Sequence, residues 1–205
     1  TTLTAGDGTD TLAMAKANYA TVAGYTTTNL AKITGFEVLS ITDALASGDS
    51  IDVSKIAGIT SFKAAAGITT GNTATVSNLG VNSTVELAGA AGNNGTLTAN
   101  LKTDTTADTM TLKLNREYTD GGDNAADPVT ASYTVLAATV ETLNVVSTGN
   151  MLPITPVDGY KADVLTNTLT LTNSDELTSL VVSGDKALSF TSDNGMTKLA
   201  TIDAS

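Results

Sequence analysis

A short motif that recurs along the chain is the feature that most constrains its fold. The motif runs apolar, any, any, apolar, any, and then a small or apolar residue, and its copies begin at Phe36, Ile59, Val140, Leu177 and Leu199. A fixed motif that returns in this way is typical of repeat proteins, in which each repeat packs on its neighbours. The motif therefore predicts stacked β-strands rather than a globular enzyme built around a pocket.

The spacing of the copies indicates how the strands stack. Ile59 follows Phe36 by 23 residues and Leu199 follows Leu177 by 22, and such intervals suit one turn of a β-helix. The wider gap between Ile59 and Val140 indicates a different packing or an insertion in the middle of the chain. We therefore predict an irregular β-solenoid, a stack that resembles a β-helix.

Composition and alternation also favour strands. Threonine is abundant, and its β-branched side chain suits the pleated, half-buried surface of a sheet. Alternating stretches at 109–114 and 165–171 have one apolar face, which fits the interior of a solenoid or of a sandwich equally. The predicted fold class is all-β, with a β-sandwich as the alternative. The candidate strands are 36–42, 50–53, 59–65, 73–77, 83–88, 95–101, 108–114, 130–136, 140–147, 164–172, 177–183, 187–191 and 198–203.

Three segments depart from the strand pattern within what we expect to be a single domain, 1–205. The segment from Thr11 to about Ala23 is rich in Ala, Met and Lys, and it predicts a short N-terminal helix capped by Asp10. The segments 116–128 and 149–161 contain the three prolines of the chain and read as loops inserted between strands.

Charge and missing residue types argue against several function classes. The net charge is -11 and Arg116 is the only arginine, which argues against nucleic acid because phosphates need basic patches. The sequence contains no cysteine and no histidine, which removes cysteine-based zinc sites and the commonest general base. Its longest apolar runs fall far short of the roughly 20 residues of a membrane span, so we expect no membrane insertion. We expect no enzymatic activity, and we keep a polysaccharide-active β-helix with paired carboxylates as an alternative.

Short acidic side chains in turns provide the candidate metal-binding positions. Aspartate and asparagine supply the hard oxygen atoms that Ca²⁺ prefers, although the same residues also cap turns. The run at 120–127 is the richest, and the run at 6–12 fits most of a Gly-rich nonapeptide pattern whose turns bind Ca²⁺. The candidate Ca²⁺ ligands are Asp7, Asp10, Asp43, Asp49, Asp52, Asp104, Asp108, Asp120, Asp123, Asn124 and Asp127.

The runs at 34–42, 140–147 and 177–184, with the Ile-Asp-Ala-Ser ending, resemble the Thr/Ala-rich β-strand repeats of Gram-negative surface-layer (S-layer) proteins. They are also similar to related RTX-type proteins exported by type I secretion, and the run at 6–12 fits that pattern. The resemblance implies a calcium-stabilised, β-rich segment that assembles into a two-dimensional lattice on the cell exterior. It also implies an export signal at the C-terminus of the full protein.

These features together predict a structural protein of the extracellular cell surface. Its expected partners are copies of itself in an S-layer lattice, with a cell-surface polysaccharide as a further candidate. An RTX-type adhesin or biofilm matrix module and an autotransporter passenger are the alternatives. The final residues, 201–205, match 50–54, and the internal copy continues into further repeat sequence. We therefore expect the chain to be a fragment of a longer repetitive protein.

Overall fold

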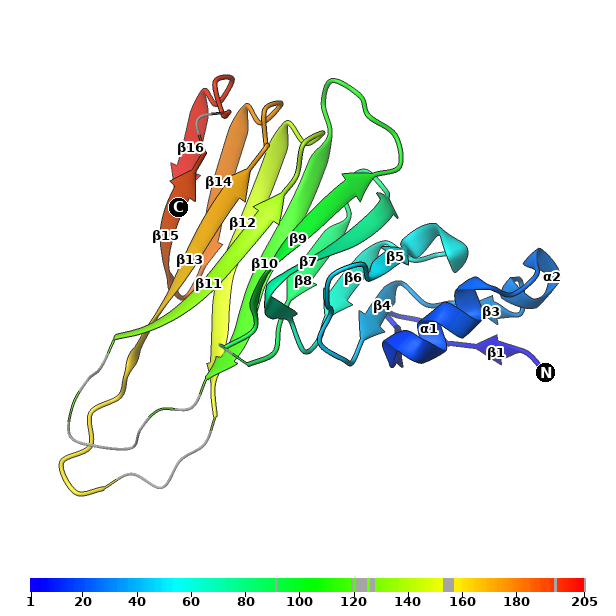
Figure 1. The fold of residues 1–205 in the computed structure, drawn as a ribbon, viewed down its shortest axis with the longest axis horizontal. Helices are drawn as coiled ribbons and strands as arrows, with labels where there is room; N and C mark the ends of the chain where they lie inside the picture. The colour runs from blue at the N-terminus through cyan, green and yellow to red at the C-terminus, as the bar shows by residue number, and fades with distance from the viewer. Residues whose placement is uncertain are drawn as a thin grey trace.

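The chain folds almost entirely into β-strands (Figure 1). The structure is a computed structural model, and it describes residues 1–90, 92–118, 120, 125, 128–152, 157–193 and 195–204. In this part of the chain, the strands β1 to β16 greatly outnumber the helices α1 (Lys16–Ala23) and α2 (Thr27–Leu30) and the single 3-10 turn η1 (Val53–Lys55). The all-β prediction is confirmed.

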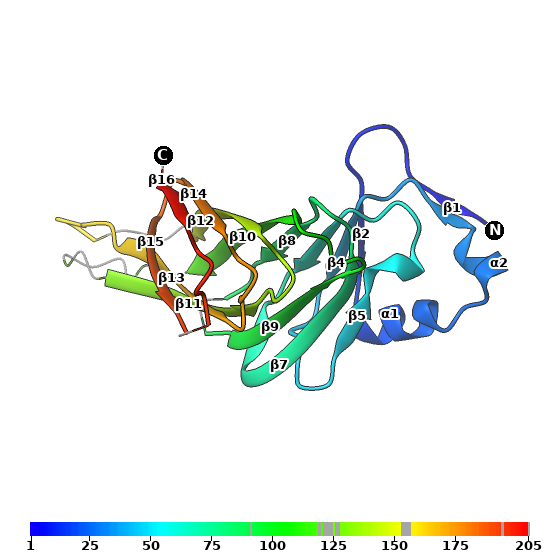
Figure 2. The same ribbon diagram turned by 90° about the horizontal axis from the view of Figure 1, so that it is seen from above.

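Two parallel sheets contain nearly all of the strands (Figures 1 and 2). The eight-stranded sheet consists, in spatial order, of β16 (Thr201–Ala204), β14 (Ser179–Gly184), β12 (Thr142–Met151), β10 (Thr109–Tyr118), β8 (Thr84–Leu87), β6 (Ser61–Ala64), β4 (Val38–Ile41) and β2 (Thr11–Met14). The six-stranded sheet consists of β15 (Ala187–Ser192), β13 (Val164–Thr172), β11 (Pro128–Leu136), β9 (Asn94–Leu101), β7 (Ile68–Leu79) and β5 (Ser50–Asp52). The short strands β1 (Leu3–Thr4) and β3 (Ile33–Thr34) form a separate pair.

From β4 onward, successive strands alternate between the two sheets. Each strand pairs in parallel with the strand two elements later, so that β4 pairs with β6 and β5 pairs with β7. Each turn of the chain therefore adds one strand to each sheet, and consecutive turns, which we call coils, lie side by side. This arrangement gives the fold its β-helix-like character.

The inward-facing side chains of the two sheets form one apolar core. In the eight-stranded sheet, one row of paired residues is 0 % exposed and consists of Leu39, Phe62, Val85, Leu112 and Val145. The same buried cluster includes, from the six-stranded sheet, Val76, Leu97, Val135, Leu169 and Leu171. Burying one such side chain contributes roughly 1.5–3 kcal/mol, so the period-2 alternation of apolar residues holds each strand against the opposite sheet.

Each copy of the sequence motif leads into a strand of the eight-stranded sheet, namely β4, β6, β12, β14 or β16. The second apolar residue is buried in the first four copies, whereas Ile202 in the last copy is 60 % exposed. The wide gap between Ile59 and Val140 contains two further coils, which add β8 and β10 to the same sheet. The packing therefore continues through the gap, and the motif is obscured in β8 because Asn82, with a positive φ of 64°, stands at its first position.

The N-terminal helix is shorter than the sequence predicts. The prediction that it begins near Thr11 with Asp10 as its cap is wrong, because residues 11–14 form β2 and α1 begins at Lys16 after the N-cap Ala15. The alternation of Leu12 and Met14 matches the neighbouring coil, so sheet pairing outweighs the helix propensity of this segment. No helix in the described ranges is long and apolar enough to cross a bilayer.

Strands extend into both segments that were expected to be loops. Strand β10 continues through Tyr118 and β11 begins at Pro128, so both ends of the range 116–128 are strand. Strand β12 runs to Met151, and β13 begins at Val164. The alternation of inward and outward side chains continues beyond Leu114, although the sequence there is polar. Arg116 occupies one of the inward positions and is 2 % exposed.

Candidate functional site

Two acidic corners, each at the N-terminal ends of two neighbouring strands of the eight-stranded sheet, share one geometry. Glu37 Oε2 accepts a hydrogen bond from the Asp10 backbone N at 2.9 Å, and Glu141 Oε2 accepts one from the Asp108 N at 2.6 Å. In both corners, the aspartate carbonyl accepts backbone N–H groups from the glutamate and from the residue after it. Each glutamate therefore links its own coil to the preceding one, so Asp10 and Asp108 lie at equivalent positions in the stack.

The Asp108 carboxylate caps a turn of its own coil. It accepts hydrogen bonds from the Thr105 N at 2.6 Å and from the Thr105 hydroxyl at 2.8 Å, and the residue is 1 % exposed. Asp104, predicted as its fellow ligand, is exposed. The turn geometry thus accounts for the buried position of Asp108.

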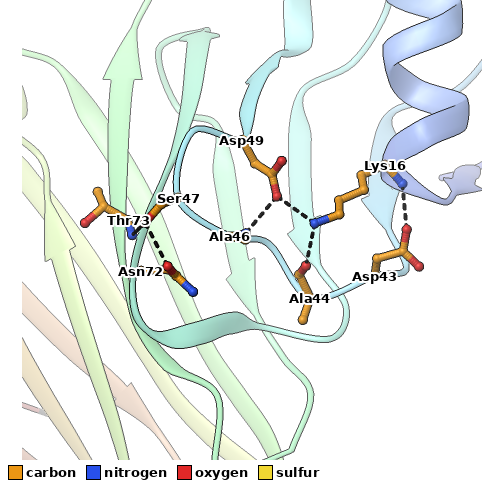
Figure 3. A network of polar contacts seen from close by, with 8 residues as sticks. All are labelled: Lys16, Asp43, Ala44, Ala46, Ser47, Asp49, Asn72 and Thr73. Atoms are coloured by element: carbon orange, nitrogen blue, oxygen red, sulfur yellow. Dashed lines mark hydrogen bonds and ion pairs between the residues drawn. The ribbon is translucent and has the colours of Figure 1, made fainter.

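Lys16 brings together two of the predicted ligands (Figure 3). The Asp43 carboxylate accepts a hydrogen bond from the Lys16 backbone N at 2.9 Å and so satisfies the first turn of α1. The Lys16 ammonium lies 3.0 Å from Asp49 Oδ2 and 3.3 Å from the Ala44 carbonyl oxygen. Asp49 also accepts from the Ala46 N at 2.7 Å. A protein cation therefore neutralises Asp49, which is the role that the sequence interpretation gave to Ca²⁺.

Asp52, the third predicted ligand of this region, caps η1. It accepts from the Ser54 N at 3.0 Å and from the Ser54 hydroxyl at 2.6 Å. Burial acts to raise the pKa of Asp52, but the hydrogen bonds from Ser54 and Asn78 outweigh it, so the pKa lies below its ordinary value. The backbone of Asp52 also exchanges hydrogen bonds with the Tyr19 hydroxyl, which fixes α1 against β5.

Asp120 is held by residues that follow β12 in the chain. Its carboxylate accepts hydrogen bonds from the Tyr160 hydroxyl at 2.8 Å and from the Asp163 N at 2.9 Å. The hydrogen bond to Asp120 raises the pKa of Tyr160 to about 12. The remaining predicted ligands of this run, Asp123, Asn124 and Asp127, lie outside the described residues.

The predicted ligands therefore lie at separate corners of the fold. Asp7 is exposed in the first turn of the chain, far in sequence from the acids of 43–52. Within the ranges that the structure describes, no three acidic side chains lie close enough together to hold a metal ion. The structure brings Asp43 and Asp49 together around Lys16, and it separates them from the corners at Asp10 and Asp108.

A polar group also lies inside the core, beneath the last residues of β10. The Arg116 guanidinium stacks on the Tyr133 ring, 4.3 Å from its centroid, and donates to the Asn94 side-chain oxygen. Burial raises the pKa of Tyr133 to about 12, and the nearby Arg116 acts in the opposite direction. In the same interior, Asn167 donates to the Ser147 hydroxyl at 2.9 Å. These contacts join strands of both sheets.

An open hollow of about 520 Å³ lies beside the Glu141 corner. Its lining includes Asp104, Glu141 and Glu176, together with Lys198. Lys198 forms an ion pair with Glu176, and Glu141 is engaged by the Asp108 amide. Glu141 and Glu176 thus serve contacts between coils, whereas Asp104 is exposed.

No protein-family model, curated protein or solved structure matches this chain. The site is therefore interpreted from its own geometry.

Sequence reasoning missed three residues that organise these corners, Lys16, Glu37 and Glu141. A signal for the two glutamates exists, because Glu37 and Glu141 both occupy the second position of the motif. No comparable signal marks Lys16, whose partners are 27 to 33 residues away in the chain.

Proposed function

We propose that this chain is a structural segment of a self-assembling S-layer protein on the cell exterior. The observation that carries the proposal is the regular alternation of strands between two parallel sheets, which we interpret as an irregular β-solenoid. A solenoid grows in one direction and presents long, repetitive outer faces. Such faces suit lateral assembly into a lattice.

The contacts of the acidic side chains support a structural role rather than a catalytic one. Glu141, Glu176 and Asp49 each bond to a neighbouring coil or to a lysine. A pair of catalytic carboxylates needs one group free to take a proton and one free to attack or to activate water. In this chain the same groups hold coils together.

Calcium is part of the proposal as a stabilising ion of the folded chain. The 21 acidic residues outnumber the 10 basic ones, and a divalent cation would relieve their mutual repulsion. A carboxylate that accepts a hydrogen bond from a backbone amide still has lone pairs that could bind an ion. The same side chain could therefore cap a turn and bind Ca²⁺. An ion that binds the folded form alone stabilises it by mass action.

Thermal melts and electron microscopy of the chain test both parts of the proposal. We expect the melting midpoint to rise in millimolar CaCl₂, to fall back with excess EGTA, and to rise less in MgCl₂ of the same ionic strength. We expect negative-stain images of the calcium-loaded protein to show ordered sheets. An unchanged midpoint would remove calcium from the proposal. Monomers that bind a surface polysaccharide instead would favour an adhesin.

A further inference from the structure

The outer face of the six-stranded sheet carries threonines aligned across five neighbouring strands. The row runs through β7, β9, β11, β13 and β15 and consists of Thr73, Thr96, Thr134, Thr170 and Thr191. A parallel row two residues earlier in the last three strands consists of Ser132, Thr168 and Ser189. We call this surface the threonine face. Its side chains repeat about every 4.8 Å across the strands and about every 6.6 Å along them.

The threonine face is uncharged. None of the five strands β7, β9, β11, β13 and β15 contains an Asp, Glu, Lys or Arg residue. The whole chain has a net charge of -11, so the charge is carried elsewhere. Charged residues are depleted at the centres of protein interfaces, because burying them costs free energy.

The eight-stranded sheet of the same molecule is an internal control. One outer row of this sheet is chemically mixed and consists of Lys63, Glu86, Lys113 and Val146. Glu86 forms ion pairs with Lys63 at 3.0 Å and with Lys113 at 3.4 Å. This sheet also carries an outer hydroxyl row across four strands, Thr109, Thr142, Ser179 and Thr201, so strand propensity contributes to such rows. What distinguishes the threonine face is therefore the absence of charged residues from its five strands, whereas the eight-stranded sheet carries Lys63, Glu86 and Lys113 side by side.

The threonine row also stays aligned although the coils differ greatly in length. Its successive members are separated by 23, 38, 36 and 21 residues. A threonine at one position of a regular repeat would align automatically, but these coils are irregular. The threonines nevertheless occupy paired positions in all five strands, although the segments that connect these strands differ in length.

We propose that the threonine face is a contact surface for a second copy of this chain, packed face to face. This inference rests on the proposed assembly function and identifies the surface through which it occurs. Net charge opposes contact between two copies, and the threonine face is where they can approach without bringing like charges together. A second copy presents the same two repeat distances, so the hydroxyl and methyl rows match in register. The outer side chains of the face include no aromatic platform on which a sugar could stack.

The expected contact is weak when it stands alone. Five strands and about six residues of each give a flat area of roughly 500 Å², which is below the roughly 800 Å² per partner of a stable isolated interface. In a lattice many such contacts act together and multiply the affinity. The isolated chain should therefore dimerise only at high concentration.

Cysteine cross-linking of the full chain tests this surface directly. The chain has no cysteine of its own, so Thr134→Cys places a single thiol at the centre of the row. Facing sheets lie about 10 Å apart, within reach of a short bis-maleimide. We expect Thr134→Cys to give at least five times more covalent dimer than Thr111→Cys, a matched outward threonine on the eight-stranded sheet.

Lysine variants test the same surface without a cross-linker. Thr134→Lys and Thr111→Lys both change the net charge from -11 to -10, so a general charge effect would be equal for the two. We expect Thr134→Lys alone to reduce association by at least fivefold in sedimentation equilibrium, with circular dichroism confirming that both variants fold.

The outcomes separate this inference from the proposed function. If Thr134→Lys still assembles into sheets like the wild type, the inference is wrong and the lattice function stands. If Thr134→Cys cross-links selectively but no sheets form, the surface is supported and the lattice is not. If Thr134→Cys does not cross-link selectively and the wild type does not assemble with calcium present, both are wrong. If a cell-wall polysaccharide shields Thr134→Cys from maleimide while the protein stays monomeric, the face has another occupant and the inference is overturned.

Discussion

Glu141 accepts a hydrogen bond from the backbone amide of Asp108, 33 residues earlier, with 2.6 Å between Oε2 and N. Glu37 makes the equivalent contact to Asp10 across 27 residues. Both glutamates stand at the second position of the motif, immediately before a strand of the eight-stranded sheet. In two of its five copies, the motif therefore carries a polar link between coils in addition to its apolar pattern.

Removing the Glu141 carboxylate should destabilise the fold. In Glu141→Ala the buried Asp108 amide loses its acceptor, and leaving a buried donor unsatisfied costs about 1–3 kcal/mol. Glu141→Gln keeps an acceptor oxygen and should lose less than half as much. Urea unfolding of both variants measures the difference, and equal losses would contradict the proposed role of the hydrogen bond.

The ion pairs of Glu86 should make stability depend on pH. Burial acts to raise the pKa of Glu86, but the hydrogen bond from Asn115 and the ammonium groups of Lys63 and Lys113 outweigh it, so its pKa lies below the ordinary 4.5. A lowered folded-state pKa stabilises the protein above the unfolded pKa, and this contribution is lost as pH falls through the folded value.

The variant Glu86→Gln isolates this contribution. At pH 7 we expect it to lower the free energy of unfolding by about 1 kcal/mol, since the pair is only partly buried. The gap from wild type should close as the pH falls below 4.5. Urea titrations at several pH values measure it, and a gap of constant size would show that the charge of Glu86 does not stabilise the sheet.

Replacing Arg116 by lysine should not be conservative. The guanidinium is planar and stacks on the Tyr133 ring, whereas an ammonium group cannot stack and is more strongly hydrated. We expect Arg116→Lys to cost about 2 kcal/mol, the value of a desolvated cation–π contact. Tyr133→Phe keeps the ring and serves as the control. Chemical denaturation of the two variants would contradict the stacking argument if Arg116→Lys were the milder change.

Gly184 should not tolerate a side chain. It has a φ of +113°, and a Cβ built on it would lie 2.1 Å from the Ser147 carbonyl oxygen of the neighbouring strand. Gly184→Ala should therefore cost about 2–4 kcal/mol through strain and local separation of the strands. Gly92→Ala is the control, because nothing lies within 4 Å of its Cβ position. Equal thermal midpoints for the two variants would contradict this expectation.

The strands were predictable because their signal is local. Every candidate strand from 36–42 to 198–203 coincides with one of the strands β4 to β16. The apolar alternation of each strand reflects burial on one side, which does not depend on which coil lies next to it. The ends of the strands were harder to predict. Arg116 lies within β10, but a charged side chain suggests an exposed loop unless its buried partners are known.

The sequence predicted the acidic residues of the turns but not the groups that contact them. The sequence pointed to Asp43, Asp49 and Asp52 as acids in turns, and each does lie near a turn. Their partners could not be foreseen, because Lys16 reaches Asp49 only through the packing of α1 beside the coil. The distinction between a cap, an ion pair and a metal ligand depends on those partners.

The sequence by itself determined that this chain is made of short strands with one apolar and one hydroxyl-rich face. The tertiary structure decided which side chains meet across coils, including Glu141 with Asp108 and the members of the threonine face. The physical reason is that the coils differ in length, with row members 21 to 38 residues apart. Sequence distance then says little about spatial register, which is fixed by backbone pairing between neighbouring strands and by the burial of their apolar sides.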